Sequence, residues 1–519
     1  MTDSVRLTPD ELNLALSFIE KNGASDFYPQ PFEFDALRAS WDKALPVLER
    51  VELLSYDPRP AVELIAPKQR YLVRPAHLLD PIDTILYAGL CFRLAPSIQR
   101  SRAYQNGLVH SFHFNPARGL PAENTFFSEW DQFEFAVRQR LTQCAFVGTA
   151  DIVDFFPRIY LHRFQNAVTD ASGDEYGTRA LMRLVEGWAH GTSYGIPTGP
   201  LPSNFLAEAL LIEVDQFLLS HGVTFVRWAD DYVLFGGTAH EIQKALHHLG
   251  ARLHTTQGLS LNPYKTRIRT VQQYVRDFVE RDPTDELYER IIDEVFGGNP
   301  YATVDFDDLG EDERAVLNEV DVVQLLEKSV EGDFIDIRAV RLVLKVLSAF
   351  GRMDLITPIV ENLERLLPVS EAVGKFFGSL DSAEGSHGDV GKQLLSRASD
   401  GVFFPEFSLM WLLHPFTLSS KWNNTWQLRR IAREARNPMV RRQAILALGH
   451  IGNRSSLLDL KATLDDTRDW EQRAILYACR ALPMDERKAI IDQMGGAGGE
   501  WNRNNVLERS VLRLLSTAP

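Results

Sequence analysis

The sequence has few cysteines and no long apolar run. Only three cysteines occur in 519 residues, and Cys91, Cys144 and Cys479 stand far apart, in no metal-binding spacing. This argues against a disulfide framework and a zinc site, and it fits a reducing cytoplasm. No stretch of eighteen apolar residues occurs, and the first residues are polar and acidic. We therefore expect neither a membrane span nor a secretory signal.

An excess of basic residues is also lacking. The chain has 55 Lys and Arg residues against 70 Asp and Glu residues, which gives a net charge of −15. A duplex-binding protein usually carries a basic footprint, so we expect weak non-specific DNA binding, although a local basic groove remains compatible with this balance. The length exceeds one ordinary core, so two or more domains are expected.

The pattern of apolar and polar residues changes twice along the chain. Residues 1–130 mix helical patches with proline-rich breaks and include a basic, extended stretch at residues 66–75. Residues 131–275 alternate short apolar strands with amphipathic helices, and residues 276–519 are almost entirely helical in pattern. Residues 281–313 and 378–391 have loop-like compositions and are predicted linkers.

The C-terminal region shows weak self-similarity. Residues 437–448 and residues 469–478 each place an arginine just before an Ala-Ile-Leu run, and residues 337–351 resemble an earlier copy. Stacked helical pairs of this kind form HEAT-like solenoids. An ordinary helical domain with chance similarity is the alternative, and both interpretations predict an all-α C-terminal domain.

Three aspartates stand at predicted strand ends. Residues 224–235 consist of two apolar, β-prone runs around Asp230 and Asp231, which predicts a hairpin with both carboxylates at its turn. About eighty residues upstream, another apolar strand ends on Asp151. Two-metal phosphoryl transfer needs carboxylates on neighbouring strands, and Mg²⁺ prefers such hard oxygen ligands. The pattern predicts a magnesium site, with Mn²⁺ as a possible substitute.

Two further segments lie at the right spacing to support this chemistry. Residues 194–202 are rich in glycine and proline and form a constrained loop, after which Ser203 opens an amphipathic helix to about Leu218. Such a loop is suited to support a base pair and an incoming nucleotide. Residues 258–266 then place Lys265 on a loop after a short strand.

This ordered set resembles the palm of reverse transcriptases. The segment at Asp151 is similar to their motif A, residues 195–208 to motif B, Trp228 to Asp231 to motif C, and residues 261–266 to motif D. Residues 67–70 resemble the fingers strand that meets the triphosphate. The resemblance covers about residues 66–269 and implies an α+β fold, with a fingers and palm domain built on an antiparallel sheet, before the helical C-terminal domain.

The resemblance also implies residue roles. Asp151 and Asp230 would be metal ligands together with the backbone carbonyl of Ile152, and Asp231 would complete the catalytic carboxylates. Lys265 would assist the departing pyrophosphate. Phe156 falls at the sugar gate, which implies deoxynucleotides. Nucleotide-binding roles fall on Lys68, Arg70, Phe156, Thr198, Gly199 and Ser203. The alternatives are a core role for Phe156, a solvated loop position for Lys265, and plain surface positions for Arg70 and Arg74.

Two departures from the usual motifs narrow the resemblance. Trp228 replaces the tyrosine of motif C, and Thr198 replaces a glutamine in the motif B loop, which puts ordinary templated copying in doubt. A palm of this kind before a long helical domain is similar to the bacterial abortive-infection (Abi) reverse transcriptases, the AbiK-like group. That implies cytoplasmic anti-phage defence, protein-primed and template-independent synthesis of single-stranded DNA from deoxynucleoside triphosphates, HEAT-like helices and a homo-oligomer.

Two other hypotheses remain open at this stage. One is a templated, retron-type enzyme that uses a dedicated RNA. The other is a non-catalytic scaffold whose helical region binds a partner. For protein priming, the candidate tyrosines include Tyr28, Tyr56, Tyr274 and Tyr301, and their local sequences do not rank them.

Overall fold

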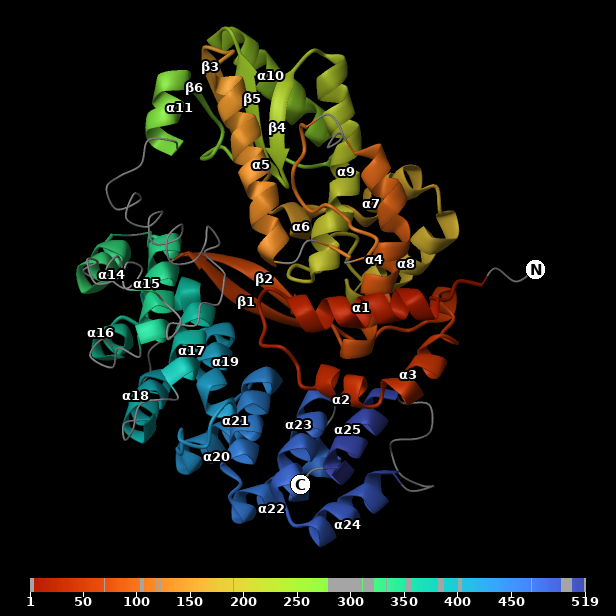
Figure 1. Ribbon diagram of the computed structural model, residues 1–519, viewed down its shortest axis with the longest axis vertical. Helices are drawn as coiled ribbons and strands as arrows, with labels where there is room; N and C mark the ends of the chain where they lie inside the picture. The colour runs from red at the N-terminus through yellow and green to blue at the C-terminus, as the bar shows by residue number, and fades with distance from the viewer. Residues whose placement is uncertain are drawn as a thin grey trace. The chain divides into compact units, whose positions relative to one another are not determined.

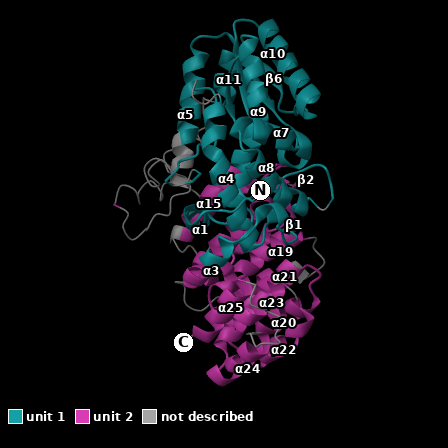
Figure 2. Cartoon of the chain, turned by 90° about the vertical axis from the view of Figure 1, so that its right-hand side faces the viewer, with its two compact units in different colours: residues 1–30, 45–63, 77–286 teal, residues 31–44, 64–76, 287–519 magenta. Residues whose placement is uncertain are grey.

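The protein is described by a computed structural model at residues 4–69, 71–102, 107–117, 119–120, 123–189, 191–278, 310, 322–332, 334–350, 356–380, 387–399, 404–467, 469–495 and 506–517. It divides into two compact units (Figure 2). The sheet unit comprises residues 1–30, 45–63 and 77–286, and the helical unit comprises residues 31–44, 64–76 and 287–519. Each unit therefore includes N-terminal chain. The boundaries predicted at residues 130 and 275 stay predictions.

A four-stranded antiparallel sheet forms the centre of the sheet unit. Its order is β4-β5-β3-β6, with β3 at Phe146–Asp151, β4 at Thr224–Trp228, β5 at Asp231–Gly236 and β6 at Arg267–Thr270. β4 and β5 form the predicted hairpin, with Trp228 opposite Asp231 and a two-residue turn at Ala229 and Asp230. The predicted α+β fold on an antiparallel sheet is thereby confirmed.

The two faces of the sheet are covered by different helices (Figure 1). Alternate side chains of a strand point to opposite faces. On one face Val147, Val226 and Val233 pack against α5 (Glu123–Leu141) and α11 (Val271–Phe278). The other face lies against α10 (Ala239–Arg252) and α9 (Leu201–Ser220), and Gly148 passes so close to Ile242 that an added Cβ would lie 2.6 Å from it.

The remaining helices of the sheet unit include α4, which is buried along most of its length and packs against α1, α7, α8 and α9. The sequence fixes several of their ends: α1 begins with a capping box at Thr8 and Glu11, and α4 begins after Asp80, whose side chain accepts from the Ile82 amide. These elements are α1 (Pro9–Asn22), α3 (Trp41–Leu48, which extends across the unit boundary), η1 (Leu53–Ser55), α4 (Pro81–Ser101), α6 (Phe155–Arg158), α7 (Leu161–Ser172), α8 (Glu175–Trp188) and η3 (Leu253–Gln257).

The helical unit combines N-terminal and C-terminal segments. Its elements are α2 (Glu33–Ala39), most of the hairpin of β1 (Val62–Gln69) and β2 (Leu72–Leu78), α14 (Val322–Val330), α15 (Ile337–Phe350), α16 (Ile356–Glu361), η6 (Leu367–Val369), α17 (Ser370–Ser379), α18 (His387–Ser399), α19 (Glu406–Leu413), η8 (His414–Thr417), α20 (Thr425–Glu434), α21 (Pro438–Ile451), α22 (Arg454–Ala462), η9 (Leu464–Asp466), α23 (Asp469–Ala478), η10 (Cys479–Ala481), α24 (Met484–Gly495) and α25 (Val506–Thr517). The prediction of a largely helical C-terminal region is confirmed.

Helix stacking and a buried ion-pair network hold the helical unit together. α21 packs on α23, α23 packs on α25, and α2 packs on α25. Glu33 of α2 is fully buried, and its carboxylate binds Arg442 Nη2 at 2.7 Å and Arg473 Nε at 3.1 Å. Arg473 also binds Glu508. The N-terminal helix α2 is therefore part of this core. The predicted linker at residues 281–313 falls almost entirely outside the described residues.

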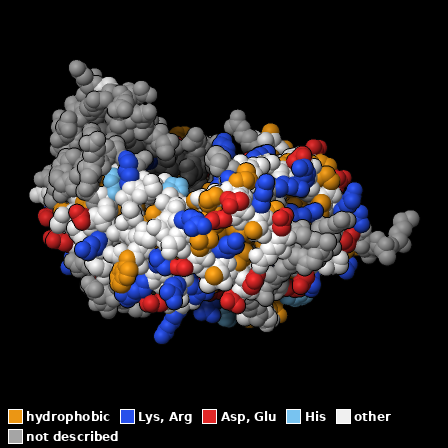
Figure 3. All heavy atoms as spheres, turned by 90° about the horizontal axis from the view of Figure 1, so that it is seen from below, with side chains coloured by type: hydrophobic (Ala, Val, Ile, Leu, Met, Phe, Trp, Pro, Cys, Tyr) orange, Lys and Arg blue, Asp and Glu red, His pale blue; other side chains and the backbone are white. Residues whose placement is uncertain are grey.

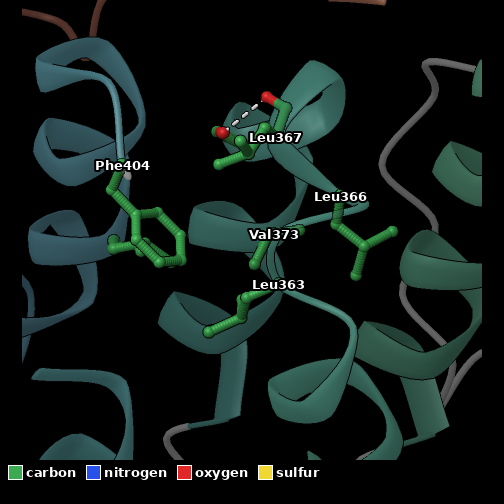
Figure 4. A pocket seen from close by; sticks show the side chains of 7 residues that line it. Leu363, Leu366, Leu367, Val373 and Phe404 are labelled. Carbon is green, nitrogen blue, oxygen red and sulfur yellow. Dashed lines mark hydrogen bonds between the residues drawn. The ribbon is translucent and has the colours of Figure 1, made fainter. Parts of the chain in front are cut away.

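The core of the helical unit also contains a small pocket (Figure 4). Its lining is leucine, valine and phenylalanine apart from Ser370, whose hydroxyl donates to the Leu367 carbonyl at 2.6 Å. Because the lining carries no charged side chain, it offers nothing that would orient a nucleotide. No helix in the described part of the chain combines the length and apolarity needed to cross a membrane.

Candidate active site

The three predicted carboxylates lie at one end of the sheet. Asp151 is the last residue of β3 and pairs directly with Asp231, the first residue of β5. Asp230 precedes it in the β4–β5 turn. Asp151 is 7% exposed, whereas Asp231 lies at the surface, so the cluster opens to solvent. This arrangement follows from the sequence, because the apolar run of β3 ends at Asp151, and Asp230 and Asp231 stand between the apolar runs of β4 and β5.

The loop after Gly258 closes over Asp151. The Lys265 ammonium lies 2.5 Å from Asp151 Oδ1, and the Asn262 side-chain amide donates to Asp151 Oδ2 at 3.0 Å. The Asn262 backbone amide also donates to the Asp151 carbonyl at 2.7 Å, and Ile152 forms an isolated bridge with Leu261. The Asp151 carbonyl, and not that of Ile152, accepts in this contact. Partial burial alone would lower the pKa of Lys265, but Asp151 and Asp231 raise it.

The carboxylates repel one another. Crowding by protein atoms, followed by the charge of Asp230, raises the pKa of Asp231 to about 7, although the residue as a whole is exposed. Among the described residues no three His, Cys, Asp or Glu side chains form a ready metal cage. Two carboxylates and bound waters are nevertheless enough for Mg²⁺, and a divalent cation would relieve this repulsion. The donor set thus fits a divalent cation.

The glycine- and proline-rich loop contacts the segment after Asp151. The Ile196 amide donates to the Phe156 carbonyl at 3.2 Å, and the Phe156 ring is half-buried beside the buried Phe155. The loop continues to Gly199, whose φ of +121° is open only to glycine; an added Cβ would lie 2.4 Å from Ser25 Oγ.

His77 holds the backbone at Thr198. The Thr198 amide donates to His77 Nδ1 at 3.0 Å, and the His77 amide donates to the Thr198 carbonyl at 2.8 Å. The Thr198 hydroxyl is enclosed and has no hydrogen-bond partner among the described residues. The loop is therefore fixed through its backbone, and the side chain at this position does not extend an amide or hydroxyl to solvent.

Three predicted nucleotide contacts remain, at Ser203, Lys68 and Arg70. Ser203 is fully buried on α9, and its hydroxyl lies 3.0 Å from the Tyr87 hydroxyl, so its observed role is to pack α9 on α4. Lys68 is exposed on β1, in the helical unit, and Arg70 lies outside the described residues. The roles predicted for these three side chains stay predictions.

Several polar residues near the site were not predicted from the sequence. Arg227 is fully buried within β4 and binds Asp215 and Glu208 of α9, and Ser111 donates to Glu208 at 2.7 Å. A signal was available for part of this group: an arginine within an apolar strand, and two acids seven residues apart on an apolar helix, must pair when buried. Ser111 and His77 gave no such signal, because their neighbours in sequence are unremarkable.

Part of the chain is similar to a known protein family. Residues 97–288 match the family model described as reverse transcriptase (RNA-dependent DNA polymerase). A solved structure of telomerase from Candida albicans, in complex with a fragment of telomeric RNA, shares 10% identity; the match covers 72% of this chain and 69% of that chain, with a TM-score of 0.30. No curated protein matches the sequence. The match to the family model spans less than half of the chain and contains Asp151, Asp230, Asp231 and Lys265. The chain thus contains a nucleotidyltransferase domain of the reverse-transcriptase family.

Proposed function

We propose that this protein is a DNA polymerase that adds deoxynucleotides by two-metal phosphoryl transfer. The observation that carries the proposal is the direct pairing of Asp151 with Asp231 beside Lys265. Nucleotide substrates and nucleic acid are the partners general to such polymerases. In the reaction a hydroxyl oxygen attacks the α-phosphorus, the bond to pyrophosphate breaks, and a phosphodiester forms.

Each side chain has a separate task in this proposal. Asp151 and Asp230 would hold Mg²⁺ or Mn²⁺, which supplies Lewis-acid chemistry when bound, with the Ile152 carbonyl as a further ligand. Lys265, raised in pKa, remains charged and donates to the departing pyrophosphate. Phe156 limits the sugar to one without a 2′-hydroxyl. Lys68 and Arg70 would bind the triphosphate.

We further propose that synthesis needs no template and serves bacterial anti-phage defence. Support comes from the loop at Thr198, where the usual glutamine amide is absent and the threonine hydroxyl is enclosed. The stacking of α21, α23 and α25 supports a HEAT-like solenoid. On the face drawn in Figure 3, Lys and Arg side chains are interspersed with Asp and Glu side chains, which suits weak general DNA binding. A cytoplasmic homo-oligomer is part of the same proposal.

Protein priming requires a tyrosine hydroxyl that a nucleotide can approach. Tyr28 and Tyr274 are buried, and the Tyr56 hydroxyl donates to Asp83 at 2.6 Å. Tyr301 lies outside the described residues. In the sheet unit Tyr264 is 84% exposed and immediately precedes Lys265, so its hydroxyl is the accessible nucleophile that we would test first.

The test uses purified protein, Mg²⁺ and each labelled deoxynucleotide without added nucleic acid. We expect label to migrate with the wild-type protein on a denaturing gel and to be released by protease. Peptide mapping would then locate the modified tyrosine, with Tyr264→Phe beside Tyr176→Phe as the control at a less exposed tyrosine. Label that appears only after a primer and RNA are supplied would instead support a templated, retron-type enzyme.

A second candidate function is that of a non-catalytic scaffold. The acidic balance and the stacked helices favour it. It predicts that phage protection survives replacement of Asp230 and Asp231 by alanine, whereas the polymerase proposal predicts that protection and incorporation are lost together. Plating efficiency of phage on cells with wild-type or doubly substituted protein separates the two.

A further inference from the structure

Ala229, the residue just before Asp230, is held by hydrogen bonds at both its backbone amide and its backbone carbonyl. The Ala229 amide donates to Ser111 Oγ at 3.0 Å, and the Ala229 carbonyl accepts from Arg227 Nη1 at 2.8 Å. Ala229 has a φ of +49°, in the left-handed region that residues with a Cβ adopt only at a cost. Hydrogen bonds at both ends of the residue offset that cost and fix the turn in this conformation.

Both contacts lead to a single buried carboxylate. Glu208 accepts from Ser111 Oγ at 2.7 Å, from Arg227 Nη1 at 2.9 Å and from Arg102 Nη2 at 2.9 Å. Arg227 also binds both oxygens of Asp215 through Nε and Nη2. The two arginines and two acids are each no more than 3% exposed, and their charges sum to zero. Burial alone would lower the pKa of Arg227, but Asp215 and Glu208 raise it, so it stays charged.

The position of this network follows from strand and helix periodicity. Arg227 points to the α9 side of the sheet, opposite the face of Trp228, because successive strand residues alternate. Glu208 and Asp215 are seven residues apart and share one face of α9. A buried ion-pair network seldom stabilises a core more than apolar residues of the same size would. Here the network instead fixes the backbone of Ala229 through hydrogen bonds.

We propose that Arg227 and Ser111 are positioning residues that preorganise the Ala229–Asp230 turn, with Glu208 as the group that couples them. They touch neither substrate nor metal. They act by fixing the direction of the Asp230 carboxylate relative to Asp151, so that metal binding requires little rearrangement. This inference rests on the proposed polymerase function, and it specifies how that site is held.

A matched pair of variants separates positioning from a merely structural role. Ser111→Ala and Tyr232→Phe each remove one hydroxyl donor from a buried carboxylate of the network, since Tyr232 donates to Asp215 at 3.0 Å. Of these two hydroxyls, the one that hydrogen-bonds Ala229 is that of Ser111. Both changes are small and should fold, which a melting curve checks; Arg227→Ala would leave two carboxylates uncompensated and is less suitable.

The first readout is hydrogen–deuterium exchange of peptides that contain Ala229, measured without metal. We expect exchange about tenfold faster or more in Ser111→Ala, and unchanged exchange in Tyr232→Phe. The second is Mn²⁺ affinity, measured from the electron paramagnetic resonance signal of free Mn²⁺. We expect this affinity to weaken several-fold in Ser111→Ala and to stay unchanged in Tyr232→Phe. The third is incorporation, where kcat should fall about tenfold, equivalent to about 1.4 kcal/mol, with little change in KM.

Equal effects of the two variants on exchange and Mn²⁺ affinity, or no effect of Ser111→Ala on either, would overturn the positioning role. Failure of the wild-type protein to incorporate nucleotides would overturn the proposed function instead. Even if the wild-type protein incorporates no nucleotide, the exchange and Mn²⁺ measurements still test whether Ser111 positions the Ala229–Asp230 turn.

Discussion

Replacement of Glu33 by glutamine should destabilise the helical unit strongly. The Glu33 carboxylate is fully buried and lies 2.7 Å from Arg442 and 3.1 Å from Arg473. Arg473 keeps Glu508 as a partner, but Arg442 is left without a carboxylate, and it is 3% exposed. Removal of one partner from such a buried network costs about 3–5 kcal/mol. The same change also places an amide NH₂ group against a guanidinium donor.

Differential scanning calorimetry measures the effect directly. For a unit of this size each 1 kcal/mol shifts the melting temperature by about 2–4 °C, so we expect a decrease of about 6–20 °C. The matched control is Glu434→Gln, which removes an exposed ion pair with Arg430 within α20 and should cost about 0–1 kcal/mol. Because the chain has two units, the shift should affect the transition of the helical unit. Equal, small shifts for both variants would refute the inclusion of Glu33 in this core.

Three further predictions concern the sheet unit. Gly199→Ala should lower both stability and incorporation, because its Cβ would overlap Ser25 and Phe27 at a φ of +121°; Gly191→Ala, at a φ of +79° with open space around the Cβ, is the control in melting and activity assays. Lys265→Met should lower kcat by about 10²-fold or more while melting is unaffected, and a kcat within twofold of wild type would exclude a catalytic role. Burial, followed by the Asp80 charge, raises the pKa of Asp83 to about 7. Between about pH 4 and 7 the folded state therefore binds a proton that the unfolded state has released, so this group's contribution to stability is present at low pH and is lost as the pH rises through 7. The melting temperatures at pH 5 and pH 8 should differ less in Asp83→Asn than in the wild-type protein. An unchanged difference would contradict this.

Local patterns predict the strands that carry the three carboxylates. An apolar, β-prone run that ends at an acid predicts that acid at a strand end, as at Asp151, and two such runs around an acidic pair predict a hairpin turn, as at Asp230 and Asp231. The structure brings Lys265 to Asp151, and the catalytic role that the resemblance implies for Lys265 stays a prediction. The predicted roles of the nucleotide-binding residues depend on placements that the sequence cannot supply, as the burial of Ser203 against Tyr87 shows.

Long-range pairings could not be predicted. Glu33 meets Arg442 and Arg473 across separations of 409 and 440 residues. No periodicity links these positions, so the sequence alone does not place the N-terminal helix α2 beside the C-terminal helices. The same holds for His77 and Thr198, which are 121 residues apart and pair through the backbone of Thr198, which any residue could supply, and the backbone amide and imidazole of His77. Buried charges within apolar segments, such as Arg227, signal that partners exist but do not identify them.

The most direct test of the catalytic assignment is the rate of labelled deoxynucleotide incorporation with Mg²⁺, measured for wild-type protein and for Asp230→Ala at matched concentration. Melting curves of the two proteins establish that both are folded, and supplied primer and template are included in a parallel reaction. The carboxylate assignment predicts that wild type incorporates nucleotides in at least one of the two reactions and that Asp230→Ala incorporates none in either. Incorporation by Asp230→Ala at the wild-type rate would contradict it.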